Sequence, residues 1–369
     1  MSGLESVLVV GTGLIGTSVA LALREHGVTV YLSDRDAAAV RLARELGAGI
    51  EWSAGDGADG GAGDRADGRV DVAVIAVPPH LVAEQLAGLQ KAGAARFYTD
   101  VASVKALPLR QAADLGCDLT SYVAGHPLAG RERSGPAAAR ADLFLGRPWA
   151  LCPTEQTSPD AVEVMRALIK LCGGEVVEVE AAEHDRAVAV VSHAPHVAAS
   201  AVAARLAEAP ATALGLAGQG VRDVTRIAAG DPGLWTGILS GNALPVADVL
   251  EAVAADLAAA AAALRASADP ETLGDVTDLL RRGVAGTGRI PGKHGGPARA
   301  YATVQVIIGD RPGELARLFQ VAQAAGVNIE DVRLEHAPGL PLGAADLSVQ
   351  PEAVPALSEA LRAHGWQLP

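Results

Sequence analysis

One glycine-rich turn near the N-terminus constrains the fold of this chain more than any other segment. The residues Gly11-Thr12-Gly13-Leu14-Ile15-Gly16 follow an apolar run, Val7 to Val10, and open a helical pattern at 14–26. The first glycine permits a tight turn, the second lets the backbone approach a pyrophosphate, and the third lets the helix pack on the strand. A tight turn without a ligand is the structural alternative, but a helix N-terminus also attracts phosphate charge. The predicted cofactor-binding residues are Gly11, Thr12, Gly13, Leu14, Ile15 and Gly16.

The second predicted strand ends in an acid that distinguishes between two cofactors. Asp34 lies about 20 residues beyond the glycine turn, at the spacing expected for a ribose-binding carboxylate. It would accept a hydrogen bond from a 2′-hydroxyl group and repel a 2′-phosphate, so the sequence favours NAD as cofactor. Arg35 could pair with a phosphate, which leaves NADP as the alternative.

Strand and helix patterns alternate through the N-terminal half of the chain, which predicts a largely parallel sheet covered by helices. We therefore assign residues 1–180 to an α/β domain with a Rossmann-type doubly wound sheet. The stretch 53–69 is almost only Gly, Ala and Asp and is expected to be a mobile surface insertion. The expected strands are 6–10, 28–32, 71–77, 96–99, 121–124, 148–152 and 175–179, and the expected helices are 14–26, 36–46, 79–91, 104–115 and 159–172.

Two further units follow in the sequence. Residues 181–283 lack strand signals and carry Ala, Val and Leu at helical spacing, which predicts an all-α domain for substrate binding and dimerisation. Asp231-Pro232 is a helix start, and Pro195 should kink the first helical run. Residues 284–299 are expected to form a linker. Residues 300–369 follow the order βαββαβ, with a short last strand near Trp366.

Charge and composition exclude several classes of partner. The net charge is −13 and no basic stretch is long enough to follow a phosphate backbone, so we expect no nucleic acid partner. The three cysteines are widely spaced and suggest neither a metal site nor a disulfide framework. We expect no membrane span, because the longest apolar stretch, 257–264, is too short. A cytoplasmic protein without an export signal fits these features.

The segment Gly125-His126-Pro127-Leu128-Ala129-Gly130 follows a predicted strand and carries the best candidate for proton transfer. In an open α/β sheet the carboxyl end of a strand faces the ligand crevice, and histidine exchanges protons near neutral pH. The alternative is a loop histidine that caps a turn. Ser103, in the segment 99–105, would either cap the next helix or hold the His126 ring by a hydrogen bond.

Two motifs in the helical region offer substrate-binding groups. Ser192-His193-Ala194-Pro195-His196 places two histidines on one helix face, and we favour His196 over His193 as the one that faces the ligand. The segment 222–228 carries two arginines around Asp223. These groups either form a solvated ion-pair face or clamp a carboxylate, for which the planar guanidinium is suited.

The segments GTGLIG, TDVASVK, GHPLAG, SHAPH, RDVTRIA and DPGLW, in this order, resemble the prephenate/arogenate dehydrogenase family. The likeness extends from the first strand to about residue 283, and GHPLAG with RDVTRIA is its specific part. The C-terminal unit, with segments 309–313 and 326–329, looks like an ACT domain, a module that commonly binds amino acids.

The resemblance implies residue roles and a reaction. His126 would be the catalytic base, Ser103 its support, Arg226 the ligand of a substrate carboxylate, and His196 a residue facing the substrate. Ser192 and Asp223 are further substrate-binding candidates. The implied reaction is NAD-dependent oxidative decarboxylation of prephenate to 4-hydroxyphenylpyruvate in tyrosine biosynthesis, with no metal, by a homodimer that pairs through its helical domain.

Alternatives remain open at this stage. Arogenate or an amino analogue of prephenate would fit the same motifs. A β-hydroxyacid dehydrogenase relies on a lysine in its helical domain, and residues 181–283 contain none. A non-catalytic amino-acid sensor would not need the polar groups that the reaction requires. The ACT-like unit either serves assembly only or binds an aromatic amino acid such as tyrosine; its predicted regulatory residues are Asp310, Arg311, Gly313 and Asn328.

Overall fold

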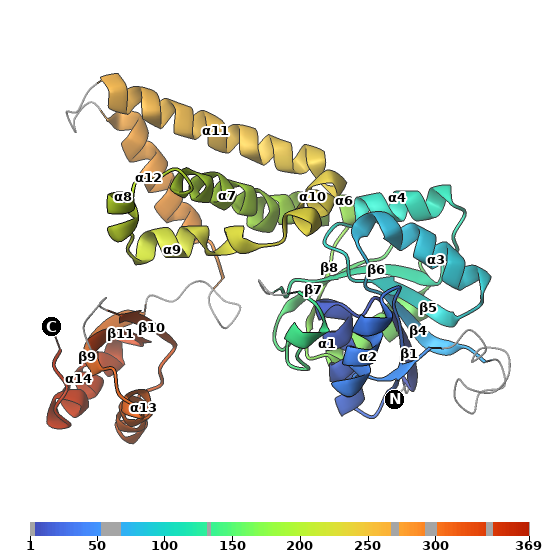
Figure 1. The fold of residues 1–369 in the computed structure, drawn as a ribbon, viewed down its shortest axis with the longest axis horizontal. Helices are drawn as coiled ribbons and strands as arrows, with labels where there is room; N and C mark the ends of the chain where they lie inside the picture. Colours follow the sequence, from blue (N-terminus) through green and yellow to red (C-terminus); the bar gives the residue numbers. More distant parts are fainter. Residues whose placement is uncertain are drawn as a thin grey trace. The chain divides into compact units, whose positions relative to one another are not determined.

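The computed structural model describes residues 4–52, 68–130, 134–266, 273–291, 301–336 and 342–368. The chain divides into two compact units, Met1–Ala254 and Ala255–Pro369, and each is described by itself (Figure 1). The predicted surface insertion at 53–69 lies almost entirely outside the described residues. The boundary expected at residue 180 falls between the last strand of the large sheet and the first helix of the helical region.

The first unit contains a sheet of eight described strands in the order β3-β2-β1-β4-β5-β6-β7-β8. Neighbouring strands are parallel except β6 and β7, which are antiparallel. The expected doubly wound sheet is therefore confirmed; the sequence patterns missed the two-residue edge strand β3. The strands are β1 Ser6–Val10, β2 Thr29–Ser33, β3 Ile50–Glu51, β4 Val70–Ile75, β5 Ala95–Asp100, β6 Tyr122–Pro127, β7 Pro148–Cys152 and β8 Glu175–Glu178.

Helices cover both faces of this sheet because alternate strand residues point to opposite sides. Residues such as Val7 and Val9 pack with α1 (Leu14–Glu25), α2 (Ala37–Glu45) and α5 (Pro159–Leu171). Leu8 and Val10 face the other side, against α3 (Val82–Lys91) and α4 (Ala106–Asp114) (Figure 1). The strand order reverses between β1 and β4, which is where such sheets bind ligands.

The rest of the first unit is helical, as expected. The run that begins at α6 is interrupted by a π-helical turn, η3, and resumes as α7, with Pro195 in the first turn of α7. The irregularity predicted from Pro195 thus lies just before the proline. Proline has no backbone N–H group to donate, and the wider π-helical turn precedes it. Asp231 caps α10 by accepting a hydrogen bond from Leu234 N (2.7 Å). The elements are α6 Ala181–Val188, η3 Ala189–His193, α7 Ala194–Leu206, α8 Ala211–Gly215, α9 Gln219–Thr225, η4 Arg226–Ala229, α10 Pro232–Gly241 and α11 Ala243–Ala266.

The run Ala181–Leu206 is long and apolar enough to cross a membrane by length and composition alone. This run is longer than the apolar stretch 257–264. The run carries the buried polar residues His184, Asp185 and His193. One third of its most apolar window (33%) is buried inside the protein, so length and composition alone do not make it a membrane span.

In the second unit, α12 extends over Gly274–Thr287. The predicted start of the linker, at residue 284, therefore falls inside this helix. Arg282 on α12 donates to Asp256 in the middle of α11 through both terminal nitrogens, at 3.0 and 2.8 Å. The residues at 292–300 lie outside the described part of the chain.

The C-terminal part forms a small antiparallel sheet in the order β10-β11-β9 with two helices. The predicted final strand is wrong: residues 366–368 form no strand, and among the described residues one backbone hydrogen bond, from Ile307 N to Gln367 O at 3.2 Å, joins them to β9. Trp366 nevertheless closes the small core. The elements are β9 Ala302–Gly309, α13 Glu314–Ala324, β10 Asp331–His336, β11 Leu342–Val349 and α14 Val354–Ala363.

The register of this small sheet separates the residues predicted to hold one effector. Gly309 pairs with Leu342 at one end of β11, whereas Asp331 pairs with Ser348 near its other end. The turn with Asp310, Arg311 and Gly313 therefore lies at the opposite end of the sheet from Asn328. Asn328 donates to Glu330 Oε1 at 2.6 Å. On one chain, Asn328 and the turn 309–313 therefore cannot hold the same small ligand.

Candidate active site

A cavity of about 630 Å³ lies within the first unit, at the carboxyl ends of β1 and β4. Its volume suits a small-molecule ligand. It collects segments that are far apart in sequence: the glycine turn, the loop after β4, the end of β6, the η3 turn and the start of α10. Its polar lining includes Ser103, His126, Ser134, Ser192, His193 and Asp231, and Trp235 contributes an aromatic wall.

The glycine turn has the geometry that a dinucleotide requires. Gly11 has φ +102°, and a Cβ atom there would lie 2.2 Å from Ala76 O. A Cβ on Gly16 would lie 1.9 Å from Gly11 O, so helix and turn touch at this point. A Cβ on Gly13 would meet nothing within 4 Å, and Gly13 lines the cavity. The turn is therefore closed on its protein side and open where a pyrophosphate would approach, which fits NAD.

Asp34 directly follows β2 and contacts the glycine turn. Its Oδ2 accepts hydrogen bonds from Thr12 N (2.6 Å) and Thr12 Oγ1 (3.1 Å), and its Oδ1 accepts from Asp36 N (2.9 Å). The carboxylate thus stands beside the turn, where it was expected. Leu14, Ile15 and Gly16 also line the cavity, together with Gly13.

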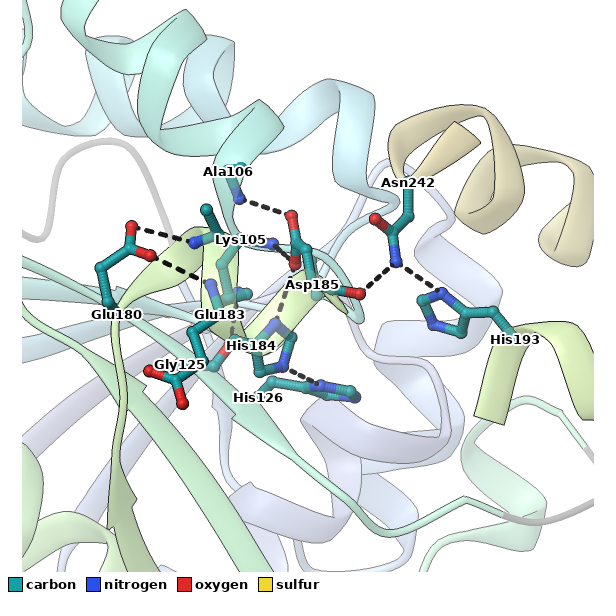
Figure 2. Close-up of polar contacts among 12 residues, drawn as sticks. Lys105, Ala106, Gly125, His126, Glu180, Glu183, His184, Asp185, His193 and Asn242 are labelled. Atoms are coloured by element: carbon teal, nitrogen blue, oxygen red, sulfur yellow. Dashed lines mark hydrogen bonds and ion pairs between the residues drawn. The ribbon is translucent and has the colours of Figure 1, made fainter. Parts of the chain in front are cut away.

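His126 is the second-last residue of β6, and it lines the cavity. Its Nδ1 is 2.9 Å from Nε2 of His184, and the two rings meet edge to face (Figure 2). Burial, followed by the positive charge of Lys105, lowers the pKa of His126 well below its ordinary value of 6.5. The ring is therefore neutral at pH 7 and able to accept a proton.

The partner of the His126 ring is a residue that the sequence interpretation missed. His184 and Asp185, on α6, are buried, and His184 Nδ1 lies 2.8 Å from Asp185 Oδ1. Ser103 lines the cavity, but within the described residues it makes no hydrogen bond to His126, so its predicted support of that ring is not seen. Ser103 also does not cap α4, because Asp185 accepts from the backbone N–H groups of Lys105 and Ala106, at 2.8 and 2.9 Å.

The signal for His184 and Asp185 was present in the sequence. His184 lies four residues before Val188, on the buried face of an otherwise alanine-rich helix, where an apolar residue would be expected. Adjacent His and Asp side chains on such a face require polar partners inside the protein.

A buried lysine supports the backbone at His126. Lys105 is fully buried, forms an ion pair with Asp100, and donates to Gly125 O at 2.5 Å. Asp100 also accepts from the hydroxyl of Tyr122 at 2.6 Å. These contacts join the ends of β5 and β6, so they fix the peptide immediately before His126.

Of the two histidines in the SHAPH segment, the structure places His193 at the cavity, whereas the sequence favoured His196. His193 lines the cavity together with Ser192, whereas His196 is not among the lining residues and stacks on Trp235, with centroids 3.5 Å apart. Burial lowers the pKa of His193 to about 4 and also lowers that of His196. Asn242 Nδ2 lies 3.1 Å from His193 Nδ1 and donates to Asp185 O at 2.7 Å (Figure 2). His193 Nε2 is buried and has no hydrogen-bond partner within the described residues.

The predicted carboxylate clamp lies outside the cavity. Arg226 begins η4 and is exposed, four residues before Gly230, which lines the cavity. Asp223 is exposed on α9 and accepts from Gln219 Nε2 at 2.8 Å. The described lining of the cavity contains no arginine or lysine, and residues 131–133 after β6 lie outside the described part.

Comparison with known proteins agrees with this geometry. The family model described as prephenate dehydrogenase, nucleotide-binding domain, matches residues 19–178, and that described as prephenate dehydrogenase, dimerization domain, matches 180–278. Probable prephenate dehydrogenase NovF of Streptomyces niveus is 40% identical over 98% of this chain and 99% of its own. Two solved structures are also similar: prephenate dehydrogenase from A. aeolicus with hydroxyphenyl propionate and NAD+ (TM-score 0.64, 25% identity, 77% of this chain and 98% of that one) and Synechocystis arogenate dehydrogenase (0.60, 26%, 77% and 99%).

Proposed function

This chain belongs to the prephenate dehydrogenase family of NAD-dependent oxidoreductases, and we propose that it converts prephenate to 4-hydroxyphenylpyruvate and carbon dioxide. The observation that carries this proposal is one cavity lined both by a neutral histidine, His126, and by a glycine turn shaped for NAD. The A. aeolicus structure, with NAD+ and a hydroxyphenyl acid, supports the same pair of ligands.

The chain's own residues account for proton removal and positioning. When bound, NAD supplies the acceptor for the hydride that leaves the ring carbon bearing the hydroxyl group. His126 takes the hydroxyl proton as negative charge develops on that oxygen. The carbonyl that forms makes loss of the ring carboxylate favourable, because the product ring is aromatic. Ser103, Ser192 and His193 line the cavity and offer hydrogen bonds to substrate oxygens.

Arg226 is the proposed ligand of a substrate carboxylate, supported by its place four residues from the cavity wall. A dianionic substrate needs a cationic partner, and a guanidinium binds a carboxylate through two parallel hydrogen bonds. His196 is proposed to act indirectly, by stacking on Trp235 and holding that wall of the cavity.

Substitution of the base tests the proposal. His126→Asn should retain NAD binding but lower turnover of prephenate by about a hundredfold or more, the usual contribution of a general base. Turnover near that of the unmodified protein would refute the assignment of His126.

Arogenate is the second candidate substrate, because one of the similar solved structures is an arogenate dehydrogenase; an amino analogue of prephenate is a third. Prephenate and arogenate differ in the keto or amino group of the side chain, so kcat/KM measured with each decides between them. A higher value for arogenate would replace prephenate in the proposal.

Two assembly features complete the proposal. The match to a dimerization domain supports a homodimer through the helical region; sedimentation as a monomer at micromolar concentration would refute it. The ACT-like likeness of residues 301–368 is supported by the small sheet with its two helices. We expect it to bind an aromatic amino acid such as tyrosine at the turn 309–313.

A further inference from the structure

His126, His184 and Asp185 form a continuous hydrogen-bonded line that begins at the cavity and ends in the protein interior. The two contacts are 2.9 Å from His126 Nδ1 to His184 Nε2 and 2.8 Å from His184 Nδ1 to Asp185 Oδ1 (Figure 2). His184 and Asp185 are each only 3% exposed, so water does not compete for these bonds. The line therefore has one end open to a ligand and one end fixed.

The fixed end is well defined. Asp185 accepts from the backbone N–H groups of Lys105 and Ala106 as well as from His184. Burial raises the pKa of Asp185, but the hydrogen bonds from His184 and from these two N–H groups outweigh burial and lower the pKa below its ordinary value. Asp185 is therefore an ionised carboxylate whose position does not depend on His184 alone.

The positions of the protons follow from this carboxylate. Because an ionised carboxylate only accepts, His184 donates to it from Nδ1. When this is the only proton on the His184 ring, its Nε2 has a lone pair, which accepts from His126 Nδ1. The other nitrogen of His126, Nε2, is left with the lone pair and is the ring nitrogen available to the cavity. His184 thereby determines which nitrogen of His126 acts as the base.

We propose that these three residues act as a proton relay in the dehydrogenation, an inference that rests on the proposed function. The proton of the substrate hydroxyl passes to His126 Nε2, and the Nδ1 proton of His126 passes to His184 Nε2. His184 then carries a proton on both nitrogens, and its positive charge lies against Asp185, which remains ionised. One proton enters the line from the substrate and none is lost, so the step balances. His126 is the catalytic residue, and His184 and Asp185 are positioning residues.

The surroundings of His126 give the relay its purpose. The described charged and titratable groups around it are Lys105 at the start of α4, His184 on α6 and His193 on η3, with Asp100 and Asp185 behind them. Lys105 and burial disfavour a positive charge on the His126 ring. Moving the proton one residue inward places that charge beside a carboxylate instead.

The resting positions of the protons can be tested without any substrate. Protein labelled with ¹⁵N in its nine histidines gives long-range ¹H–¹⁵N spectra that report the tautomer of each ring. We expect Nδ1–H tautomers at His126 and His184, assigned through His126→Asn and His184→Gln. An Nε2–H tautomer at His126 in the resting protein would overturn the relay, whichever substrate the enzyme uses.

The movement of two protons is tested by single turnover in mixtures of H₂O and D₂O with prephenate and NAD. The amide introduced by His184→Gln can accept a hydrogen bond from His126 and donate one to Asp185, but it cannot carry an additional proton. We expect a bowed dependence of rate on deuterium fraction for the unmodified protein, and a straight one with a rate at least tenfold lower for His184→Gln. The control Glu183→Gln, an exposed neighbour on α6, should match the unmodified protein.

Three results separate the possible failures. A straight dependence in the unmodified protein, or a His184→Gln rate equal to that of the unmodified protein, overturns the relay even if prephenate is the substrate. Failure of the unmodified protein to oxidise prephenate overturns the proposed function, and the spectra then still decide the tautomers. If His184→Gln and Glu183→Gln bind NAD with the same affinity as the unmodified protein, the fold of both variants is intact.

Discussion

The buried imidazole of His193 makes the stability of the first unit depend on acid in a way that the structure quantifies. His193 is fully buried, and burial lowers its pKa from 6.5 to about 4. In the unfolded chain the same ring has its ordinary pKa, so below pH 6.5 the unfolded state binds a proton that the folded state does not. Stability from this group is fully present above pH 6.5 and is lost as the pH falls toward 4.

The size of the effect follows from the two pKa values. Between pH 7.5 and pH 5, a shift from 6.5 to 4 removes about 2 kcal/mol from the free energy of unfolding, at about 1.4 kcal/mol per pH unit. The low pKa of His126 adds to the total fall in the same direction. The contribution of His193 alone is therefore the difference between the unmodified protein and His193→Gln.

Urea unfolding at pH 7.5 and pH 5, followed by tryptophan fluorescence, measures this difference. Three of the four tryptophans, Trp52, Trp149 and Trp235, lie in the first unit and report its unfolding. The substitution itself lowers stability at both pH values, but it should reduce the loss between them by about 2 kcal/mol. An identical loss in both proteins would refute the account of His193 as a neutral, buried ring.

Three further predictions concern the cofactor turn, the substrate and the C-terminal sheet. Gly13→Ala should raise the Kd for NAD at least tenfold in calorimetry without changing the Tm, because the added Cβ meets no protein atom. Gly16→Ala should lower both the Tm and the affinity for NAD, because its Cβ would lie 1.9 Å from Gly11 O. Equal effects of the two substitutions would contradict the assigned roles. Arg226→Ala should raise the KM for prephenate about tenfold to a hundredfold with little change in kcat, as expected for loss of a charge-assisted contact. The comparison variant Arg222→Ala should raise the KM by a smaller factor. A fall in kcat alone for Arg226→Ala would count against carboxylate binding. Deletion of residues 300–369 should abolish inhibition by tyrosine and leave basal turnover intact; inhibition that persists in the shortened chain would place tyrosine in the active site.

The strand–turn–helix pattern was readable because local rules determine it. Glycine spacing, apolar runs and the Asp231-Pro232 helix start depend on a few consecutive residues, and the structure confirms the doubly wound, largely parallel sheet and the helix cap that they predict. The antiparallel pairing of β6 with β7 was not readable, since pairing direction depends on contacts between segments more than 20 residues apart.

Site residues that belong to short sequence motifs were predicted. Contacts between residues from distant parts of the sequence were missed. His126, Ser103 and Ser192 share one cavity, as expected. The partner of His126 comes from α6, 58 residues away, and Asp185 both caps α4 and contacts His184. The sequence indicates that His184 and Asp185 are buried and need polar partners, but no local pattern shows which residues those partners are. The separation of the predicted regulatory residues was not readable for a related reason: strand register, which local sequence does not determine, places Asn328 at the opposite end of its sheet from the turn 309–313.

The most direct test of the central claim is the stoichiometry of one reaction. Purified protein mixed with NAD and prephenate should show a rise at the reduced-nicotinamide absorbance band, with one carbon dioxide released and one 4-hydroxyphenylpyruvate formed per NAD reduced. His126→Asn should abolish nearly all of this rise. No rise with the unmodified protein, or a rise without release of carbon dioxide, would contradict the account.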